Sequence, residues 1–200
     1  MPSNSAAGRG LLFFRRFLEN PRQVGAICPS TRHLGRAMVK ELPLRPGDLV
    51  VEYGCGTGAL TSVIVDHVER TPGARFLGIE REGHFCEVLR RRFPSHDFAH
   101  AQVEQVRELL AARGLPAPRA ILSGLPLILL PTLEQIVTTA AEVVQPGGEF
   151  RTFSYLQSYP LAATRRLRRL MRARFADFRQ RGPVLRNFPP AFVLCARRAA

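Results

Sequence analysis

The stretch Val50–Gly58, which reads VVEYGCGTG, decides the fold. Its first residues complete a short apolar segment over 48–53, and a helical pattern begins where it ends and continues over 58–69. Between the two lie glycines at positions 54, 56 and 58. Glycine lets a backbone turn sharply after a strand and approach a ligand closely. The stretch therefore predicts a buried strand, a ligand-binding turn and a helix, in that order.

Two acidic residues accompany this turn. Glu52 lies two residues before the first glycine, and Glu80 ends the next predicted strand. An acid at the second place can accept hydrogen bonds from ribose hydroxyls, as in dinucleotide-binding folds. However, the GxGxG spacing with an acid inside the first strand is the pattern of S-adenosylmethionine methyltransferases, because it leaves room for an amino acid moiety rather than a pyrophosphate. The sequence thus predicts a site for S-adenosylmethionine.

Strands and helices alternate along the rest of the chain. Further strands are predicted over 75–80, 97–101, 119–125 and 149–156, with helices over 83–93, 102–113 and 131–144. This alternation indicates an α/β, Rossmann-like fold with a mostly parallel central sheet and helices on both faces. An amphipathic helix over 161–180 and an edge or hairpin strand over 191–196 are expected to follow.

The N-terminal region has an amphipathic pattern of its own. Apolar and charged residues separate onto two arcs of a helix predicted over 7–18, and a second helix is predicted over 30–41. We therefore divide the chain in two. Residues 1–42 are expected to contact a membrane and cover the site, and residues 43–200 are expected to form the methyltransferase domain.

A second candidate loop, Ser123–Pro126, follows the fourth predicted strand and reads SGLP. In amino-methyltransferases this position carries a short motif of a polar residue, Pro or Leu, Pro and an aromatic residue. Its side-chain oxygen and carbonyls hold the substrate nitrogen in line with the methyl group, at roughly 3–3.5 Å. The predicted catalytic acceptors are therefore Ser123 and the carbonyls of Gly124 and Leu125.

Two tyrosines, Tyr155 and Tyr159, lie at and just after the end of the fifth predicted strand, at the edge of the sheet where such folds bind ligands. Either hydroxyl could pass a substrate proton to water, and either ring could hold a methylated cation by cation–π contact. We expect both at the catalytic site.

Three segments together resemble the short soluble bacterial phosphatidylethanolamine N-methyltransferases, which are relatives of the rRNA adenine dimethyltransferases. These segments are NPRQVGAICPS (20–30), EYGCGTG (52–58) and SGLPLILLP (123–131). The resemblance implies a class I methyltransferase that converts phosphatidylethanolamine stepwise, through its mono- and dimethyl forms, to phosphatidylcholine. S-adenosylhomocysteine would be the by-product.

The resemblance also implies a set of cofactor residues, namely Glu52, Gly54, Gly56, Gly58 and Glu80. We add four further predicted cofactor residues, namely Tyr53, Arg81, Gln102 and Ser123. The chain departs from the family after the third predicted strand. Proteins of this fold commonly place an acid near the adenine there, whereas this sequence reads His-Ala-Gln over 100–102. Gln102 or a backbone N–H is expected to take the place of that acid.

Charge is unevenly distributed along the chain, whose net formal charge is +13. Residues 1–40 hold seven basic residues and one acidic residue, and residues 151–200 hold twelve arginines and one aspartate. Two basic ends on an acidic body predict a polyanionic partner. Because the implied substrate is a lipid, anionic membrane lipids are expected to bind the 161–180 segment and Arg9, Arg15 and Arg16. We expect a cytoplasmic monomer at the inner face of the cytoplasmic membrane.

Two other functions remain open. An rRNA adenine N6-methyltransferase would share the fold and the basic charge, but such enzymes typically carry Asn-Leu-Pro-Tyr, whose ring stacks on the flipped base. Here aliphatic residues follow Pro126, so nucleic acid is not the favoured partner. A non-catalytic membrane-binding protein would have no need of an intact glycine loop. The four cysteines lack metal-ligand spacing, so no metal is expected.

Overall fold

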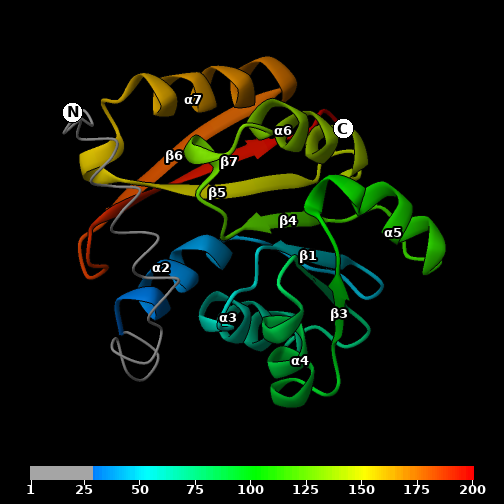
Figure 1. The fold of residues 1–200 in the computed structure, drawn as a ribbon. Helices are drawn as coiled ribbons and strands as arrows, with labels where there is room; N and C mark the ends of the chain where they lie inside the picture. The colour runs from blue at the N-terminus through cyan, green and yellow to red at the C-terminus, as the bar shows by residue number, and fades with distance from the viewer. Residues whose placement is uncertain (1–28) are drawn as a thin grey trace.

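A seven-stranded sheet organises residues 29–200, the part of the chain that the computed structural model describes (Figure 1). The strand order is β3-β2-β1-β4-β5-β7-β6. Strands β1 to β5 are parallel, whereas β7 runs antiparallel to both of its neighbours. The strands are β1 (Leu49–Tyr53), β2 (Arg75–Glu80), β3 (Asp97–His100), β4 (Ala120–Ser123), β5 (Glu149–Tyr155), β6 (Asp177–Val184) and β7 (Ala191–Arg197).

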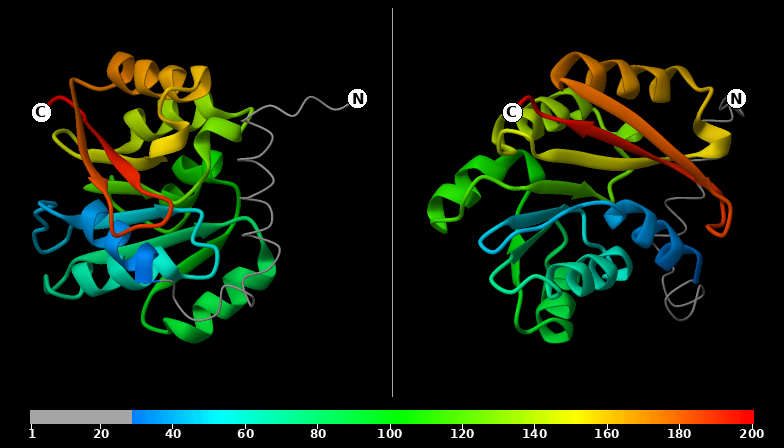
Figure 2. Two further views of the ribbon diagram at one scale, coloured as in Figure 1. Left: turned by 90° about the vertical axis from the view of Figure 1, so that its left-hand side faces the viewer. Right: turned by 180° about the vertical axis from the view of Figure 1, so that it is seen from behind.

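Helices cover both faces of this sheet, as Figures 1 and 2 show. One face carries α2 (Pro29–Val39), α3 (Ala59–Val68) and α4 (Gly83–Arg92), and the other carries α5 (Val106–Ala112), α6 (Leu133–Val143) and α7 (Ala162–Arg174). The short 3-10 helices are η1 (Val103–Gln105), η2 (Leu127–Leu129) and η3 (Leu156–Ser158). The predicted α/β fold with a mostly parallel sheet is confirmed. No helix within residues 29–200 is long and apolar enough to cross a membrane.

The central strand β1 illustrates why the sequence folds in this way. All five of its residues are buried, since a parallel sheet is covered on both faces. Val51 and Tyr53 join the core under α5, α6 and α7, and Val50 joins the core under α2, α3 and α4. By the alternation of a strand, Glu52 points to the same side as Val50. The strand therefore places a carboxylate in an apolar core. Burial of a carboxylate costs folding free energy unless a hydrogen bond or an opposite charge offsets it.

The C-terminal hairpin differs from the sequence prediction. The helix predicted over 161–180 is wrong beyond Arg174, and Asp177–Val184 forms the edge strand β6. Phe175 and Phe178 continue the helical spacing of the apolar residues before them, and both still face the same core, so the pattern concealed the change from helix to strand. β7 is a hairpin strand, as predicted, but it lies between β5 and β6 and is not an edge. The helix predicted over 7–18 lies outside the described residues.

A buried arginine joins α2 to the sheet. Arg151 on β5 is fully buried, and its guanidinium donates to the carbonyls of Met38 at 2.7 Å and Lys40 at 2.8 Å, at the end of α2. It also pairs with Glu149 at 2.7 Å, and Arg197 reaches the same carboxylate at 2.8 Å. Burial alone would raise the pKa of Glu149, but the two arginines outweigh it and lower this pKa below its usual value. The cation thus satisfies carbonyls that have no partner within the helix.

Replacement of Arg151 should therefore destabilise the fold strongly. Arg151→Met leaves the α2 carbonyls without their donor and the buried Glu149 with Arg197 as its one remaining cationic partner among residues 29–200, and removal of one member of a buried ion pair costs about 3–5 kcal/mol. Arg197→Met is the matched control, because it removes a partner of the same carboxylate from a side chain that is 46% exposed. It should cost about 1 kcal/mol or less. Urea denaturation measures both, and equal losses would contradict the role of Arg151.

Candidate active site

The loops after β1, β2 and β4 lie at the carboxyl edge of the parallel strands, where folds of this kind bind ligands. The loop after β1 contains the three predicted glycines. All have positive φ angles, which are 73° at Gly54, 50° at Gly56 and 82° at Gly58. This left-handed region strains other residue types. The turn from β1 into α3 therefore depends on glycine at each of these positions.

The loop after β4 packs directly against this glycine loop. Gly124 donates its N–H to the carbonyl of Tyr53 at 2.8 Å. A Cβ on Gly124 would lie 2.9 Å from the carbonyl oxygen of Gly54, and a Cβ on Gly54 would lie 2.3 Å from Leu125 Cδ2. Gly56 differs, since a Cβ there would have no described atom within 4 Å. The backbone at Gly56 is therefore the part of the loop that a ligand can approach.

Glu80 fixes the glycine loop to the end of β2. Its carboxylate oxygens accept the backbone N–H groups of Gly56 at 2.7 Å and Glu82 at 2.9 Å. A carboxylate has about four acceptor positions, so these bonds leave room for ribose hydroxyls. The structure thus places Glu80 beside the glycine loop, in position for the cofactor contact that the sequence predicts.

Glu52 is fully buried, and neither of its carboxylate oxygens has a hydrogen-bond partner within residues 29–200. Burial raises the pKa of Glu52 to about 8, and the side chains of Thr61 and Cys55 offset part of the rise. The hydroxyl of Thr61 on α3 is also buried without a described partner. An unsatisfied buried carboxylate costs free energy that a cationic ligand group would offset. The α-ammonium of S-adenosylmethionine is such a group, so these residues fit the predicted cofactor.

Tyr53 contributes its backbone to this site rather than its ring. Its carbonyl accepts the N–H of Gly124, while its ring lies in the opposite core, 6.5 Å from that of Phe150. Burial raises the pKa of the Tyr53 phenol, whose oxygen has no hydrogen-bond partner among the described residues. The side chain therefore packs away from the glycine loop.

The predicted acceptors of the substrate amine lie at the end of β4. Ser123 is fully buried, and its hydroxyl oxygen accepts the N–H of Leu125 at 3.3 Å. The carbonyl of Leu125 accepts the N–H of Leu127 at 2.9 Å. The carbonyl of Gly124 accepts no hydrogen bond from residues 29–200. Of the three predicted acceptors, Gly124 is thus the one whose oxygen is free for a ligand, and Ser123 orders the loop around it.

Two of the predicted cofactor residues have exposed side chains. Arg81 pairs with Glu82 at 3.0 Å, and Gln102 forms a capping box with Gln105 at the start of η1. Each side chain therefore already has a partner beside the site. Neither bonds to the glycine loop, and their contacts with the cofactor stay predictions.

The two candidate tyrosines lie on opposite faces of the sheet. Tyr155 packs with the core under α2, α3 and α4, where its ring is 5.5 Å from that of Phe153, and burial raises its pKa. Tyr159 contacts Phe192, which packs against the other core. The guanidinium of Arg168 lies 3.8 Å from the centre of the Tyr159 ring, so that ring already holds a cation. The structure does not bring the two tyrosines together.

Thr61 is a candidate site residue that the sequence analysis missed. Its hydroxyl lies close to Glu52, as the effect on the pKa of that carboxyl indicates. The available signal was its position three residues after Gly58, at helical spacing from the buried residues Ile64 and Val68. A polar residue on the buried stripe of a helix has a reason to be there, but the pattern alone does not reveal its partner.

Comparison with known proteins connects this geometry to a family. Residues 15–108 match the family model described as Protein-L-isoaspartate(D-aspartate) O-methyltransferase (PCMT). The chain is also 30% identical over 185 residues to the ornithine lipid N-methyltransferase of Singulisphaera acidiphila, and the match covers 90% of this chain and 91% of that enzyme. The chain belongs to the S-adenosylmethionine-dependent class I methyltransferases. Its activity is methyl transfer from S-adenosylmethionine, and the predicted cofactor is confirmed.

Two further similarities are more limited. The methyltransferase is 29% identical over 117 residues to the ribosomal RNA small subunit methyltransferase A of Thermotoga petrophila, a match that covers 58% of this chain and 42% of that enzyme. The crystal structure of the CurJ carbon methyltransferase has a TM-score of 0.66, at 15% identity, over 96% of this chain and 59% of that chain. The similarity to the CurJ structure shows that the two proteins share a fold.

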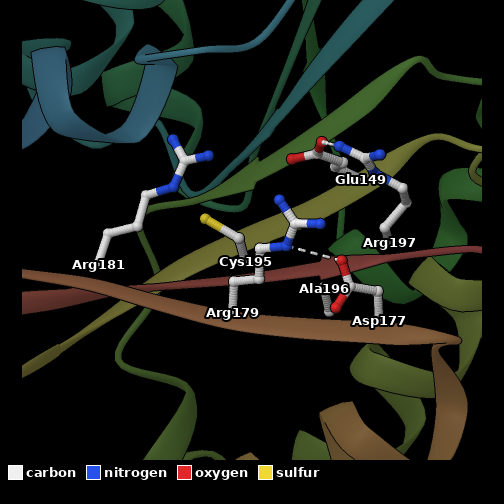
Figure 3. Close-up of a pocket in the computed structure, with 7 residues that line it drawn as sticks. All are labelled: Glu149, Asp177, Arg179, Arg181, Cys195, Ala196 and Arg197. Carbon is white, nitrogen blue, oxygen red and sulfur yellow. Dashed lines mark hydrogen bonds and ion pairs between the residues drawn. The ribbon is translucent and has the colours of Figure 1, made fainter.

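The pocket drawn in Figure 3 contains no residue of the glycine loop in its lining. Strands β5, β6 and β7 line it with Glu149, Asp177, Arg179, Arg181, Cys195, Ala196 and Arg197. Its acids are already paired, Asp177 with Arg179 at 2.8 Å and Glu149 with Arg197 at 2.8 Å. Strand β4 separates β1 from these three strands. The geometry of the glycine loop, rather than this pocket, defines the candidate site.

Gly56→Ala should separate cofactor binding from stability. Gly56 and Gly147 both have positive φ, 50° and 69°, and a Cβ on either would have no described atom within 4 Å. Alanine should cost each variant about 1 kcal/mol of unfolding free energy. Only Gly56→Ala should lose affinity for S-adenosylhomocysteine, by about 10-fold or more, because its Cβ fills the space that the ligand approaches. Calorimetric titration measures this, and equal affinities would show that the cofactor does not approach Gly56.

Glu52 should make the ligand-free methyltransferase less stable as the pH rises. Its pKa in the folded state, about 8, lies above the usual 4.5. The folded state therefore prefers protonated Glu52, and the stability that this preference contributes is fully present below about pH 4.5. It is lost as the pH rises through about 8, by up to about 1.4 kcal/mol of unfolding free energy per pH unit. Glu52→Gln should flatten this dependence, whereas Glu82→Gln, an exposed control, should not. Urea denaturation across this range tests it, and an unchanged slope in Glu52→Gln would contradict the raised pKa.

Proposed function

We propose that this methyltransferase methylates the amine headgroup of phosphatidylethanolamine, in steps that lead through the mono- and dimethyl forms to phosphatidylcholine. The observation that carries the proposal is the similarity to an ornithine lipid N-methyltransferase, which extends over 90% of this chain and 91% of that enzyme. The name of that relative describes methylation of a nitrogen on a lipid. The resemblance of segments 20–30, 52–58 and 123–131 to phosphatidylethanolamine N-methyltransferases favours phosphatidylethanolamine as the lipid here.

The free carbonyl of Gly124 suggests how the amine is oriented. When bound, S-adenosylmethionine supplies a methyl group on a positively charged sulfur, which is a good leaving group. The Gly124 carbonyl has no described donor and lies on the loop that touches Gly54. It is suited to accept an N–H of the neutral primary or monomethyl amine and so direct the nitrogen lone pair toward the methyl group in the first two steps. The neutral dimethyl amine has no N–H, so its orientation in the third step does not come from this bond.

The amine must also lose a proton, because the headgroup is an ammonium near pH 7 and has no lone pair to attack with. Tyr155 lies at the end of β5, and burial raises its pKa, so the phenol stays neutral and can relay a proton by donating its own toward water as it accepts the one from the amine. Arg168 already covers the ring of Tyr159. We therefore assign the proton path and any cation–π contact to Tyr155 rather than Tyr159.

A lipid substrate implies that the enzyme works at a membrane surface, as a peripheral monomer at the inner face of the cytoplasmic membrane. Helix α7 supports this, because Leu167 and Met171 are buried while its arginines are mostly exposed. Arginines near an anionic surface contribute about 1 kcal/mol each to binding. We assign lipid binding to α7 and to Arg9, Arg15 and Arg16, which lie outside the described residues.

A second candidate function is adenine N6-methylation of rRNA, which the partial match to ribosomal RNA small subunit methyltransferase A favours. That match covers 42% of the RNA enzyme. In addition, the loop after β4 continues into η2 with Leu127, Ile128 and Leu129. None of these side chains can stack on a flipped base as an aromatic ring does. The lipid proposal is therefore the stronger one.

Labelled S-adenosylmethionine distinguishes the two functions in one experiment. The enzyme is incubated with phosphatidylethanolamine vesicles, with ornithine lipid vesicles and with protein-free rRNA, and the label in each is counted. We expect label first in the monomethyl form of phosphatidylethanolamine and later in the dimethyl form and in phosphatidylcholine. Gly147→Ala should retain this activity and Gly56→Ala should lose most of it. Label in rRNA alone, or in ornithine lipid alone, would contradict the proposed substrate.

A further inference from the structure

Exposed apolar side chains gather at one corner of the molecule. Four large hydrophobic side chains stand out by their exposure within residues 29–200, and three of them lie on η3 and on the turn between β6 and β7. Leu156 is 43% exposed, Leu185 is 72% exposed and Phe188 is 82% exposed. The fourth, Val88 on α4, is 36% exposed. A Phe and a Leu that protrude from one turn are unusual for a surface with no partner.

The turn that carries Leu185 and Phe188 is held in place by hydrogen bonds. The Asn187 side chain, 4% exposed, donates to the carbonyl of Pro189 at 2.6 Å, and its backbone N–H donates to the carbonyl of Val184 at 3.2 Å. The buried amide thus fixes the turn from within. Because the Asn187 side chain occupies the interior of the turn, Leu185 and Phe188 point outward even though the turn is ordered.

This turn lies at the same edge of the sheet as the glycine loop. β5 runs parallel to β4 and hence to β1, and Tyr155 at its carboxyl end pairs with Ala191 at the start of β7. The turn that precedes Ala191 must therefore lie at the carboxyl edge of the parallel strands. Leu156 belongs to the same corner, since its N–H donates to the carbonyl of Pro190 at 2.8 Å. Figure 1 shows the turn at the left, on the side to which β4 points.

The charge around the turn selects its partner. Arg186 lies exposed between the two apolar side chains, and residues 178–200 contain no acidic residue. Helix α7, which starts from the same edge after η3, carries six arginines and no acid. This surface is complementary to anionic lipid headgroups around an apolar interior. A stable protein interface needs about 800 Å² and 20–30 residues on each partner, which a few side chains on one turn do not provide.

We propose that the β6–β7 turn is a membrane-docking element, in which Leu185 and Phe188 insert among the acyl chains and Arg186 binds anionic headgroups. Leu156 extends the inserted surface from η3. The inference deepens the proposed function, because insertion at this place would set the site edge against the bilayer that contains the lipid amine. The predictions for residues 1–42 and 161–180 concern other segments, so the turn adds a third contact.

The absence of tryptophan from the chain allows a direct test. Phe188→Trp and the control Val88→Trp each introduce a single fluorophore. Each variant is mixed with vesicles of phosphatidylethanolamine and phosphatidylglycerol, and then with vesicles whose acyl chains are brominated. We expect a blue shift and quenching for Trp at 188, and neither for Trp at 88. An unchanged spectrum at 188 would overturn the proposal. A shift that depends on protein concentration without vesicles would also overturn it, by showing that a second copy covers the turn.

A charge variant gives a second measurement. Phe188→Glu combined with Leu185→Glu should lower vesicle binding by about 10-fold or more, whereas Val88→Glu should not. S-adenosylhomocysteine affinity should stay normal in both, which shows that the fold and cofactor site are intact. Methylation of lipid in detergent micelles separates docking from substrate choice. If the turn inserts but phosphatidylethanolamine is not methylated, the docking proposal stands and the proposed substrate is wrong. If phosphatidylethanolamine is methylated but the turn does not insert, the proposed substrate stands and the docking proposal is wrong.

Discussion

The contact between the loops after β1 and β4 is the constraint on which the site depends. Gly54 and Gly124 approach so closely that neither could carry a side chain, and Leu125 fills the space beside Gly54. In methyl transfer the acceptor, the methyl carbon and the sulfur must be aligned closely, since a displacement of about 1 Å can cost two orders of magnitude in rate. Direct backbone contact fixes the distance between the two loops without flexible side chains between them, and both loops are short extensions of neighbouring strands.

Arg151 extends this rigidity from the sheet to a helix. One guanidinium binds Glu149 on its own strand and the carbonyls at the end of α2, so α2 cannot shift relative to β5 without leaving these carbonyls and two donors of the buried guanidinium without partners. α2 packs in turn against α3, which starts directly after the last glycine of the loop. The neighbouring strand β4 carries the acceptor loop. The buried ion pair therefore positions a helix that packs against α3, and its role is structural rather than catalytic.

Much of the fold and part of the site could be predicted from the sequence. Buried strands followed by turns have short-range signals, so the order of β1 to β5, the glycine loop and the place of Glu80 were all predictable. Strand β6 was not, because Phe175, which is the C-cap of α7, and Phe178, which lies on β6, keep the helical spacing of the apolar residues before them and both face one core. Side-chain partners depend on long-range packing. Nothing local indicates that Tyr155 and Tyr159 lie on opposite faces, that Gln102 caps η1 or that Thr61 lies near Glu52.

On the proposed function, the basic charge has two effects that work together. An anionic membrane surface attracts protons as well as arginines, so an amine at that surface holds its proton more firmly than in water. A protein of net charge +13 that docked there would bring positive charge near the amine, and nearby positive charge favours the neutral amine. The loop that carries Gly124 continues into apolar residues, among them the buried Leu127, and such surroundings would act in the same direction, because desolvation disfavours an ammonium. The charge that would bring the enzyme to the lipid would therefore also help to release the proton that blocks methyl transfer.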